Sequence, residues 1–239
     1  MDNKQFKQIE EFIGQKLTKT NFEQFQNFVQ LFNFYNSHTN LMSKNAQSLL
    51  FEKHIFDSLS LALFFQKYKI SSTASLLDVG TGGGFPSIPL AIVYPDLKIT
   101  PVDSIAKKIG FVELIQKELR LESMNPICKR VENFNDSIKN SFDLVTSRAV
   151  ASLNVLLEYT VPFVKKDGYF VAFKSKNAND ELNVAQNAMK VLNCQLVDVI
   201  QYNLPLKEDF TRELLVFKKI EKTSILYPRK SGLVRKNPL

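Results

Sequence analysis

The sequence predicts an α/β protein with a mainly parallel sheet of seven strands, helices on both faces and a helical extension in front. From Ser75 onwards, short strand-like runs alternate with helical patterns, and this order is typical of a parallel sheet covered on both sides. Before Ser75, apolar residues recur at helical spacing. An acid and three spaced glycines follow the first strand-like run, as expected of a tight turn that opens a helix.

The first part of the chain, residues 1–70, is expected to form helices that pack on the sheet. Phenylalanines spaced three or four apart continue to Tyr35, and a third helix is expected over Ser48–Tyr68. This stripe of phenylalanines is interpreted as a packing face rather than a platform for stacked bases. We expect residues 71–220 to form the main domain and residues 221–239 to form a basic tail.

Strands and helices should then alternate along the main domain. The expected strands cover Leu76–Gly80, Lys98–Val102, Asn125–Lys129, Phe142–Ser147, Gly168–Lys174, Leu196–Tyr202 and Arg212–Phe217. The expected helices cover Ile88–Val93, Ile105–Leu119, Leu153–Val164 and Asp180–Leu192. No helix is expected between the last two strands, which predicts an antiparallel hairpin at one edge. Pro101 is expected to end the second strand early, because proline cannot donate to the ladder.

Charge and composition indicate the kind of partner and the cellular compartment to expect. The net charge is +7, and the segment from Lys218 to the end carries about +6 of it, with seven bases and one acid. Basic tails usually bind polyanions, although a solvated tail without a partner is the alternative. Cys128 and Cys194 form no CxxC motif or disulfide framework. With no membrane-spanning run and a polar N-terminus, the protein is expected in the cytoplasm.

The glycine loop carries the clearest chemical signal. Gly80, Gly82 and Gly84 form G-x-G-x-G, whereas the dinucleotide fingerprint G-x-G-x-x-G would need glycine in place of Phe85. This loop suits the adenosyl amino acid S-adenosylmethionine (AdoMet) better than NAD. Asp78, which precedes the loop, could orient it as a buried structural acid or meet the ammonium group of the ligand.

Three later strand ends carry further candidates. Asp103 can accept hydrogen bonds from both ribose hydroxyls of an adenosine, or cap the following helix, or do both. Val131 and Glu132, after the third strand, stand where an adenine edge could be held. Arg148 follows an apolar strand and needs an anionic or carbonyl partner, so it is expected to serve the site where substrate and methyl donor meet.

Together these motifs resemble the bacterial small-subunit rRNA methyltransferase G family, also called glucose-inhibited division protein B. The resemblance runs from about Phe22 to the last residue. Its motifs are Tyr35-Asn36, Asn40-Leu41, His54-Ile55-Phe56-Asp57-Ser58, Asp78-Val79-Gly80-Thr81-Gly82-Gly83-Gly84-Phe85-Pro86, Asp103-Ser104, Arg130-Val131-Glu132, Ser147-Arg148-Ala149, and the ending Tyr227-Pro228-Arg229-Lys230 with Lys236-Asn237-Pro238-Leu239. The chain departs from the family pattern at Met42, Ser87 and Pro101.

The resemblance implies a Rossmann-like class I AdoMet-dependent methyltransferase that modifies N7 of one guanine in 16S rRNA, near the decoding centre. It places AdoMet contacts on Gly80, Phe85, Val131, Glu132 and Arg148, beside the candidates Asp78, Gly82 and Asp103. Because N7 has a free lone pair and no proton to lose, in-line transfer should need alignment and neither general base nor metal. Arg148 is the candidate for positioning the substrate.

The remaining candidates concern partners and docking. Arg229, Lys230, Arg235 and Lys236 of the tail are expected to contact RNA phosphates, with 16S rRNA in the 30S subunit or its precursor as the substrate of a monomeric enzyme. His54 and Asp57 are expected to dock the N-terminal helices onto the sheet rather than to contact RNA, and Asn40 to cap a helix or line the ligand mouth. The alternatives left open are an NAD(P)-dependent oxidoreductase, a non-catalytic RNA-binding module and a methyltransferase of small molecules or other RNA.

Overall fold

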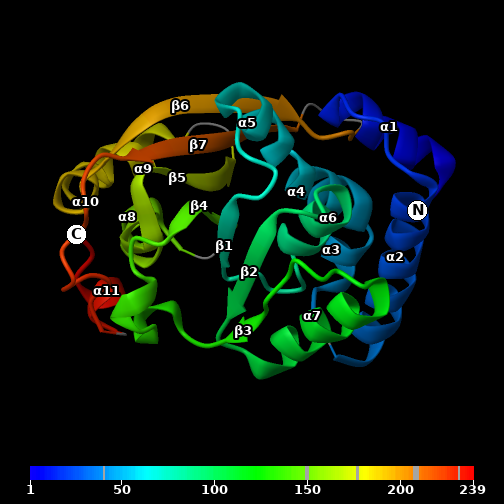
Figure 1. Ribbon diagram of the computed structural model, residues 1–239, viewed down its shortest axis with the longest axis horizontal. Coiled ribbons are helices and arrows are strands. Elements are labelled where there is room, and N and C mark those ends of the chain that lie inside the picture. Colours follow the sequence, from blue (N-terminus) through cyan, green and yellow to red (C-terminus); the bar gives the residue numbers. More distant parts are fainter. Residues whose placement is uncertain (40, 149–150, 176–177, 207–209, 231) are drawn as a thin grey trace.

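A seven-stranded mixed sheet forms the centre of the computed structural model, which describes all residues except 40, 149–150, 176–177, 207–209 and 231 (Figure 1). The strand order is β3-β2-β1-β4-β5-β7-β6. The strands are β1 (Ser75–Val79), β2 (Lys98–Asp103), β3 (Ile127–Cys128), β4 (Phe142–Arg148), β5 (Val164–Ser175), β6 (Cys194–Asn203) and β7 (Thr211–Lys219). The first five are parallel, and β7 runs antiparallel to both β5 and β6. The predicted fold class and the antiparallel hairpin at one edge are therefore confirmed.

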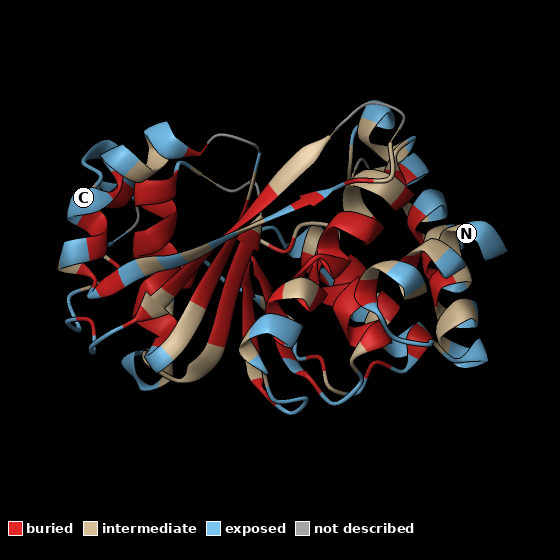
Figure 2. Cartoon of the chain, turned by 90° about the horizontal axis from the view of Figure 1, so that it is seen from above, coloured by how far each residue is buried: buried red, intermediate tan, exposed pale blue. Residues whose placement is uncertain are grey.

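Helices cover both faces of this sheet. One face carries α4 (Asp57–Leu59), α5 (Leu61–Tyr68), α6 (Ser87–Val93) and α7 (Ala106–Leu119), with α1 (Asn3–Ile13), α2 (Lys19–Thr39) and α3 (Lys44–Gln47) further out. The other carries α8 (Leu153–Thr160), α9 (Asn179–Val184), α10 (Gln186–Val191) and the tail helix α11 (Leu233–Lys236). The chain therefore begins and ends at opposite ends of the long axis (Figures 1 and 2).

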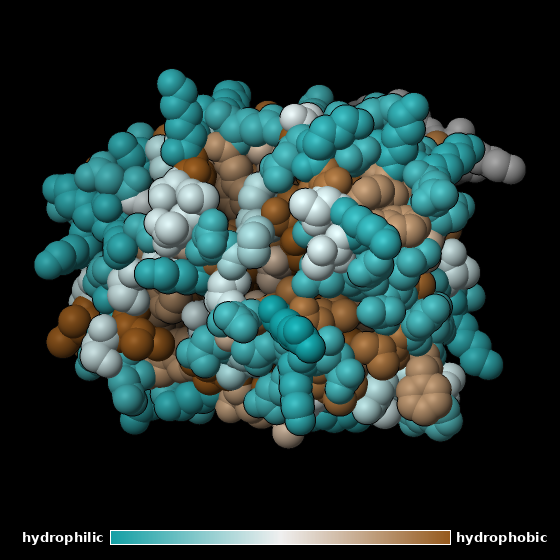
Figure 3. Space-filling model, turned by 45° about the vertical axis from the view of Figure 1, so that its right-hand side comes forward, coloured by the Kyte–Doolittle hydropathy of each residue, from teal (hydrophilic) through white to brown (hydrophobic). Residues whose placement is uncertain are grey.

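Neighbouring strand residues feed two separate cores. Leu76 and Leu144 pack with the N-terminal helices in one buried cluster, while Leu77 and Val145 pack with α8 in the other. This alternation follows from the two-residue period of a strand. Buried residues line the sheet and the inner sides of the helices, whereas exposed residues lie outside (Figure 2). Hydrophilic side chains dominate the face shown in Figure 3.

Several expected elements differ in extent, among them the helix expected over Asp180–Leu192, which is divided into α9 and α10. The helix expected over Ser48–Tyr68 is divided, with a π-helical turn at Phe51–Phe56 before α4 and α5. The helix expected to reach Val164 ends at Thr160, and a 3₁₀ turn containing Pro162 leads directly into β5. The third strand is shorter than expected and covers only Ile127–Cys128.

Pro101 does not end β2, so that expectation was wrong. Peptide groups of successive residues face opposite neighbours, and the Ile99 and Asp103 peptides both bond on the β3 side. Pro101 therefore faces that side too, where β3 pairs only with Val102 and Asp103. Its missing N–H costs no bond to β1, and β2 continues to Asp103. No helix among the described residues is long and apolar enough to cross a membrane.

Candidate functional site

The glycine loop lies between β1 and α6, at the point where the sheet order reverses. Its start is tied to β2, because the amides of Gly80 and Thr81 both donate to the Val102 carbonyl, at 2.8 and 3.0 Å. Gly84 has a φ of +90°, and a side chain there would collide with Ile88. Ligands bind at such switch points in α/β sheets, and this backbone leaves room for one.

Asp78 lies beneath the loop and is fully buried. Its Oδ2 accepts a 2.6 Å hydrogen bond from the hydroxyl of Ser87, one of the positions at which the chain departs from the family pattern. Burial raises the pKa of Asp78 to about 7, against the opposing effect of hydrogen bonding by Ser87 and Thr81. This position favours the interpretation of Asp78 as a structural acid that supports the loop.

Asp103 joins the end of β2 to both the loop and α7. Its Oδ2 accepts from the Gly82 amide at 3.1 Å, and its Oδ1 accepts from the Ile105 amide at 3.0 Å. Lys108 lies 3.5 Å from Oδ2. Asp103 also lines a pocket at this edge of the sheet, so it combines local bonding with a position at the pocket, as expected.

A pocket of about 310 Å³ opens at the carboxyl ends of β1, β2 and β4. Predicted residues that line it are Gly80, Asp103, Val131, Glu132 and Arg148. Residues that line it but were not predicted as cofactor contacts include Ile105, Lys108, Lys129, Arg130, Tyr159 and Arg235. Ile105 had a detectable signal, an apolar residue at the start of a helix, whereas the position of Tyr159 depends on the packing of α8.

Three predicted cofactor residues, Asp78, Gly82 and Phe85, are not part of the pocket lining. The Phe85 ring is 3% exposed and packs 5.6 Å from Phe28 and 5.5 Å from Phe32 of α2, measured between ring centroids. This ring therefore joins the N-terminal extension to the loop.

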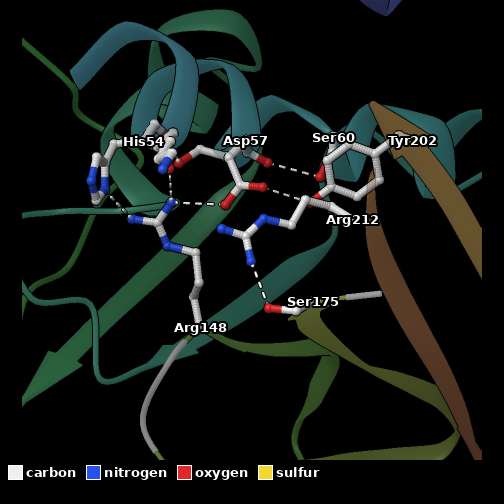
Figure 4. A network of polar contacts seen from close by, with 9 residues as sticks. His54, Asp57, Ser60, Arg148, Ser175, Tyr202 and Arg212 are labelled. Atoms are coloured by element: carbon white, nitrogen blue, oxygen red, sulfur yellow. Dashed lines mark hydrogen bonds and ion pairs between the residues drawn. The ribbon is translucent and has the colours of Figure 1, made fainter. Parts of the chain in front are cut away.

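Arg148 is held by the segment that precedes α5. Its Nη1 donates to Asp57 Oδ2 at 3.0 Å and to the Lys53 carbonyl at 3.2 Å, and its Nη2 lies 3.0 Å from His54 Nδ1. Tyr202 of β6 donates to the other Asp57 oxygen at 2.7 Å. Figure 4 shows the guanidinium of Arg148 pointing at His54 and Asp57, with Tyr202 beyond that carboxylate.

These contacts agree with the predicted docking of His54 and Asp57 onto the sheet, and they add a link to Arg148 that was not predicted. His54 lies in the π-helical turn at Phe51–Phe56 and Asp57 directly follows that turn, and both side chains meet one guanidinium. Two other motif residues, Asn40 and Ala149, lie outside the described residues. Among the described residues, no three His, Cys, Asp or Glu side chains lie close enough together to hold a metal ion.

His54 is held neutral at this position. Burial, together with the smaller effects of the positive charges of Arg148, Arg212 and Lys53, lowers its pKa to about 3. A guanidinium can only donate, so the hydrogen-bond network assigns His54 Nδ1 as the acceptor and leaves the ring proton on Nε2. Arg148 therefore meets one carboxylate and two neutral acceptors.

Protonation of His54 should destabilise the fold as the pH falls. The folded pKa is about 3 and the ordinary value is 6.5, so this contribution to stability is complete above pH 6.5 and is lost as the pH falls towards 3. At about pH 4 the loss should be on the order of 3 kcal/mol. Unfolding by urea at about pH 7 and about pH 4 measures it.

His54→Asn is the matched variant, because it keeps an acceptor near the Nδ1 position but has no titrating ring. It should lose much less stability than the parent protein on acidification. Because the pKa of Asp78 is raised, its protonation stabilises the folded state as the pH falls. This opposite contribution is present in both proteins. Equal losses in the two proteins would contradict the assignment.

The basic tail folds back onto α8. Arg229 donates to Glu158 through its backbone amide and Nε, at 2.9 and 2.8 Å to Oε1, and through Nη2 at 2.6 Å to Oε2. The Glu158 side chain is 0% exposed. Arg229 was expected to contact RNA phosphate, but the structure pairs its guanidinium with a buried carboxylate.

The other basic residues of this segment divide into two groups. Lys218 and Lys219 belong to β7, where Lys218 pairs with Asp167 at 3.0 Å and Lys219 is buried. Lys222, Lys230, Arg235 and Lys236 are exposed. Charge counting along the sequence therefore overstated how many bases the tail presents to a partner.

The role expected of Asp103 predicts a loss of cofactor affinity on neutralisation. Asp103→Asn keeps the size of the side chain and one acceptor oxygen but removes the charge that strengthens hydrogen bonds from ribose hydroxyls. AdoMet affinity should fall by about 10- to 100-fold, measured by calorimetry. Asp96→Asn, at an exposed turn before β2, is the control and should leave affinity unchanged; equal affinities for both variants would reject the role.

Comparison with known proteins supports the family suggested by these residues. The family model for the rRNA small subunit methyltransferase G, GidB, matches residues 21–210. Proteins named ribosomal RNA small subunit methyltransferase G from Brevibacillus brevis and Lactobacillus acidophilus are 38% and 41% identical to this chain. These matches cover 100% of both chains in the first case, and 96% of this chain and 98% of the relative in the second.

Solved structures share the fold at low sequence identity. The YcgJ protein from Bacillus subtilis is 14% identical with a TM-score of 0.55, over 68% of this chain and 98% of that one. A mutant of the 16S rRNA (adenine(1408)-N(1))-methyltransferase from Catenulisporales acidiphilia is 14% identical with a TM-score of 0.52, over 67% of this chain and 92% of that one. The fold, the strand-end residues and the full-length relatives agree, and the chain belongs to the rRNA small subunit methyltransferase G family.

Proposed function

We propose that the protein transfers a methyl group from AdoMet to N7 of one guanine in 16S rRNA. The observation that carries this proposal is the position of Arg148, which lines the pocket while three acceptors from the N-terminal extension fix its guanidinium. A rigid cation is thereby placed at the edge of an adenosine-sized site. Family membership supplies the class of reaction, and this geometry supplies a means of orienting the substrate.

The pocket residues suit AdoMet. Asp103 and Glu132 offer acceptors to the ribose and the adenine, and the glycine loop offers bare backbone to the methionine part. A volume of about 310 Å³ lies at the lower end of the range for small-molecule pockets, about 300–1,000 Å³. When bound, AdoMet supplies a methyl carbon that its sulfonium charge activates.

Arg148 retains donors for the substrate. A guanidinium has five N–H groups, and the contacts to Lys53, Asp57 and His54 account for three of them. The remaining two can hold the O6 carbonyl of a guanine while N7 stays free to attack. N7 has no proton to lose, so the protein has to align the ring rather than deprotonate it.

In the proposal, each of the three parts of the chain has its own role in binding cofactor or RNA. Residues 71–220 bind the cofactor, and residues 1–70 fix Arg148 and close the site behind Phe85. In the tail, the exposed Lys222, Lys230 and Lys236 are the bases left for contacts with RNA phosphate. The proposed substrate is rRNA in the 30S subunit or its precursor, modified in the cytoplasm by the monomeric protein.

Transfer of label to a mapped nucleotide tests the proposal. Purified protein is incubated with tritiated AdoMet and either 30S subunits or free 16S rRNA from cells that lack the enzyme. The expected result is label on one guanine, released with the base after treatment that depurinates N7-methylguanosine. Label on another atom, or binding of AdoMet without transfer to either RNA, would contradict the proposed function.

A further inference from the structure

The end of the chain is anchored beside the cofactor pocket. Arg229 clamps the tail to the buried Glu158 of α8, and its Nη2 also donates to the Asn237 carbonyl at 2.9 Å. Val234, in α11, is fully buried in the same core as α8. The docked tail is thus bound to α8 through Arg229 before α11 and through Val234 within it, and Arg229 also holds the residue that follows α11.

This docking brings Arg235 to the pocket. Arg235, Tyr159 of α8 and Glu132 all line it, together with Val131. Tyr159 is 6% exposed. Burial raises the pKa of its hydroxyl, Glu132 raises it further and Arg235 lowers it, as expected when both charged groups lie close to the phenol oxygen.

We propose that the docked tail forms the adenosine-side wall of the cofactor pocket, with Arg235 and Tyr159 as binding residues for the nucleoside. Arg235 donates to the ring nitrogens of the adenine or lies against its face, and Tyr159 links it to Glu132. This inference rests on the proposed function only in taking AdoMet as the ligand. It assigns Arg235 to the cofactor rather than to RNA.

Docking of the tail and binding of the cofactor must then strengthen each other. Arg235 reaches the pocket only when Arg229 and Val234 hold the tail on α8, so a cofactor that binds Arg235 favours the docked state. By thermodynamic linkage, the docked tail raises cofactor affinity by the same factor.

The first test compares adjacent bases of the same helix. Arg235→Ala should weaken AdoMet binding by about 10-fold or more in calorimetry without RNA, because a hydrogen bond from a charged donor is worth about that factor. Lys236→Ala removes an equal charge from an exposed side chain that does not line the pocket, and should leave affinity unchanged. Both variants should melt at the same temperature as the parent protein without cofactor. Parental AdoMet affinity in Arg235→Ala would overturn the proposal.

The second test measures the coupling. AdoMet should slow tryptic cleavage of the tail of the parent protein severalfold, but not that of Arg235→Ala. Glu158→Gln weakens the clamp on Arg229 without touching the pocket, and should also reduce AdoMet affinity. Unchanged affinity in Glu158→Gln, or equal tryptic rates with and without AdoMet, would overturn the coupling.

These results separate the inference from the proposed function. Tail-dependent AdoMet binding without methylation of rRNA would reject the function and keep the tail in the cofactor site. Methylation of rRNA with parental AdoMet affinity in Arg235→Ala would keep the proposed function and reject the role of the tail in the cofactor site. A parent protein that binds no AdoMet would overturn both.

Discussion

Replacing Arg148 with alanine is expected to lower kcat for rRNA methylation by about 100-fold or more, because poor alignment of reacting groups costs at least that factor. AdoMet affinity should fall less, since Asp103, Glu132 and the loop backbone remain. The measurement is single-turnover methyl transfer with both substrates saturating, so that the chemical step is observed separately from binding.

Arg148→Lys separates alignment from folding. Removing the guanidinium leaves Asp57, which is 4% exposed, with Tyr202 as a side-chain partner and so destabilises the docked extension. Lysine restores the charge, but its compact ammonium lacks the planar fork with which arginine reaches three acceptors and two substrate positions. A folded Arg148→Lys protein should therefore still transfer methyl groups at least about 10-fold more slowly than the parent protein. Parental single-turnover rates in this variant would show that Arg148 has no role beyond charge.

His54 and Asp57 should act through Arg148. Neither residue is among those that line the pocket, so their replacement should lower kcat with little effect on AdoMet affinity. This split distinguishes positioning residues from binding residues, and it gives the N-terminal extension a part in catalysis.

Replacing Arg229 with alanine is expected to lower the free energy of unfolding by about 3–5 kcal/mol. The reason is the carboxylate of Glu158, which is 0% exposed and accepts from Arg229 at 2.6 to 2.9 Å. Without the guanidinium, a buried charge keeps only the backbone amide as a donor, unless the tail detaches and water enters. Urea unfolding at neutral pH measures the loss.

Two further variants identify the buried charge as the cause. Lys230→Ala removes the next base, which is exposed, and should change stability by less than about 0.5 kcal/mol. Combining Arg229→Ala with Glu158→Leu removes both charges and should recover much of the loss, because replacing both members of a buried ion pair is far less costly than removing one. Equal stabilities of the Arg229→Ala and Lys230→Ala proteins would contradict this account.

Local patterns carried most of the fold prediction. Strand residues at a period of two and helical residues at a period of 3.6 repeat within a short window, so they can be read without the tertiary structure. Pro101 shows the limit of such local patterns. Its effect depends on which neighbouring strand its peptide faces, and this is decided by the pairing of β2 with β1 and β3.

Some residues of the site could be predicted from the sequence, and others could not. Gly80, Asp103, Val131, Glu132 and Arg148 were found from the sequence because parallel strands bring their carboxyl ends to one edge, so residues that end strands must meet there. Tyr159 and Arg235 follow no strand. Their place at the pocket results from how α8 and the tail pack on the sheet.

By itself, the sequence determined the sheet, the glycine loop and the family, because each of these depends on residues close together in the chain or on full-length similarity. Only the tertiary structure decided what the charged residues do. It buried Glu158 and thereby made Arg229 a structural clamp, placed Arg235 in the pocket, and joined Arg148 to His54 and Asp57. The physical reason is that the partner of a charge is set by packing between elements far apart in sequence, which no local pattern records.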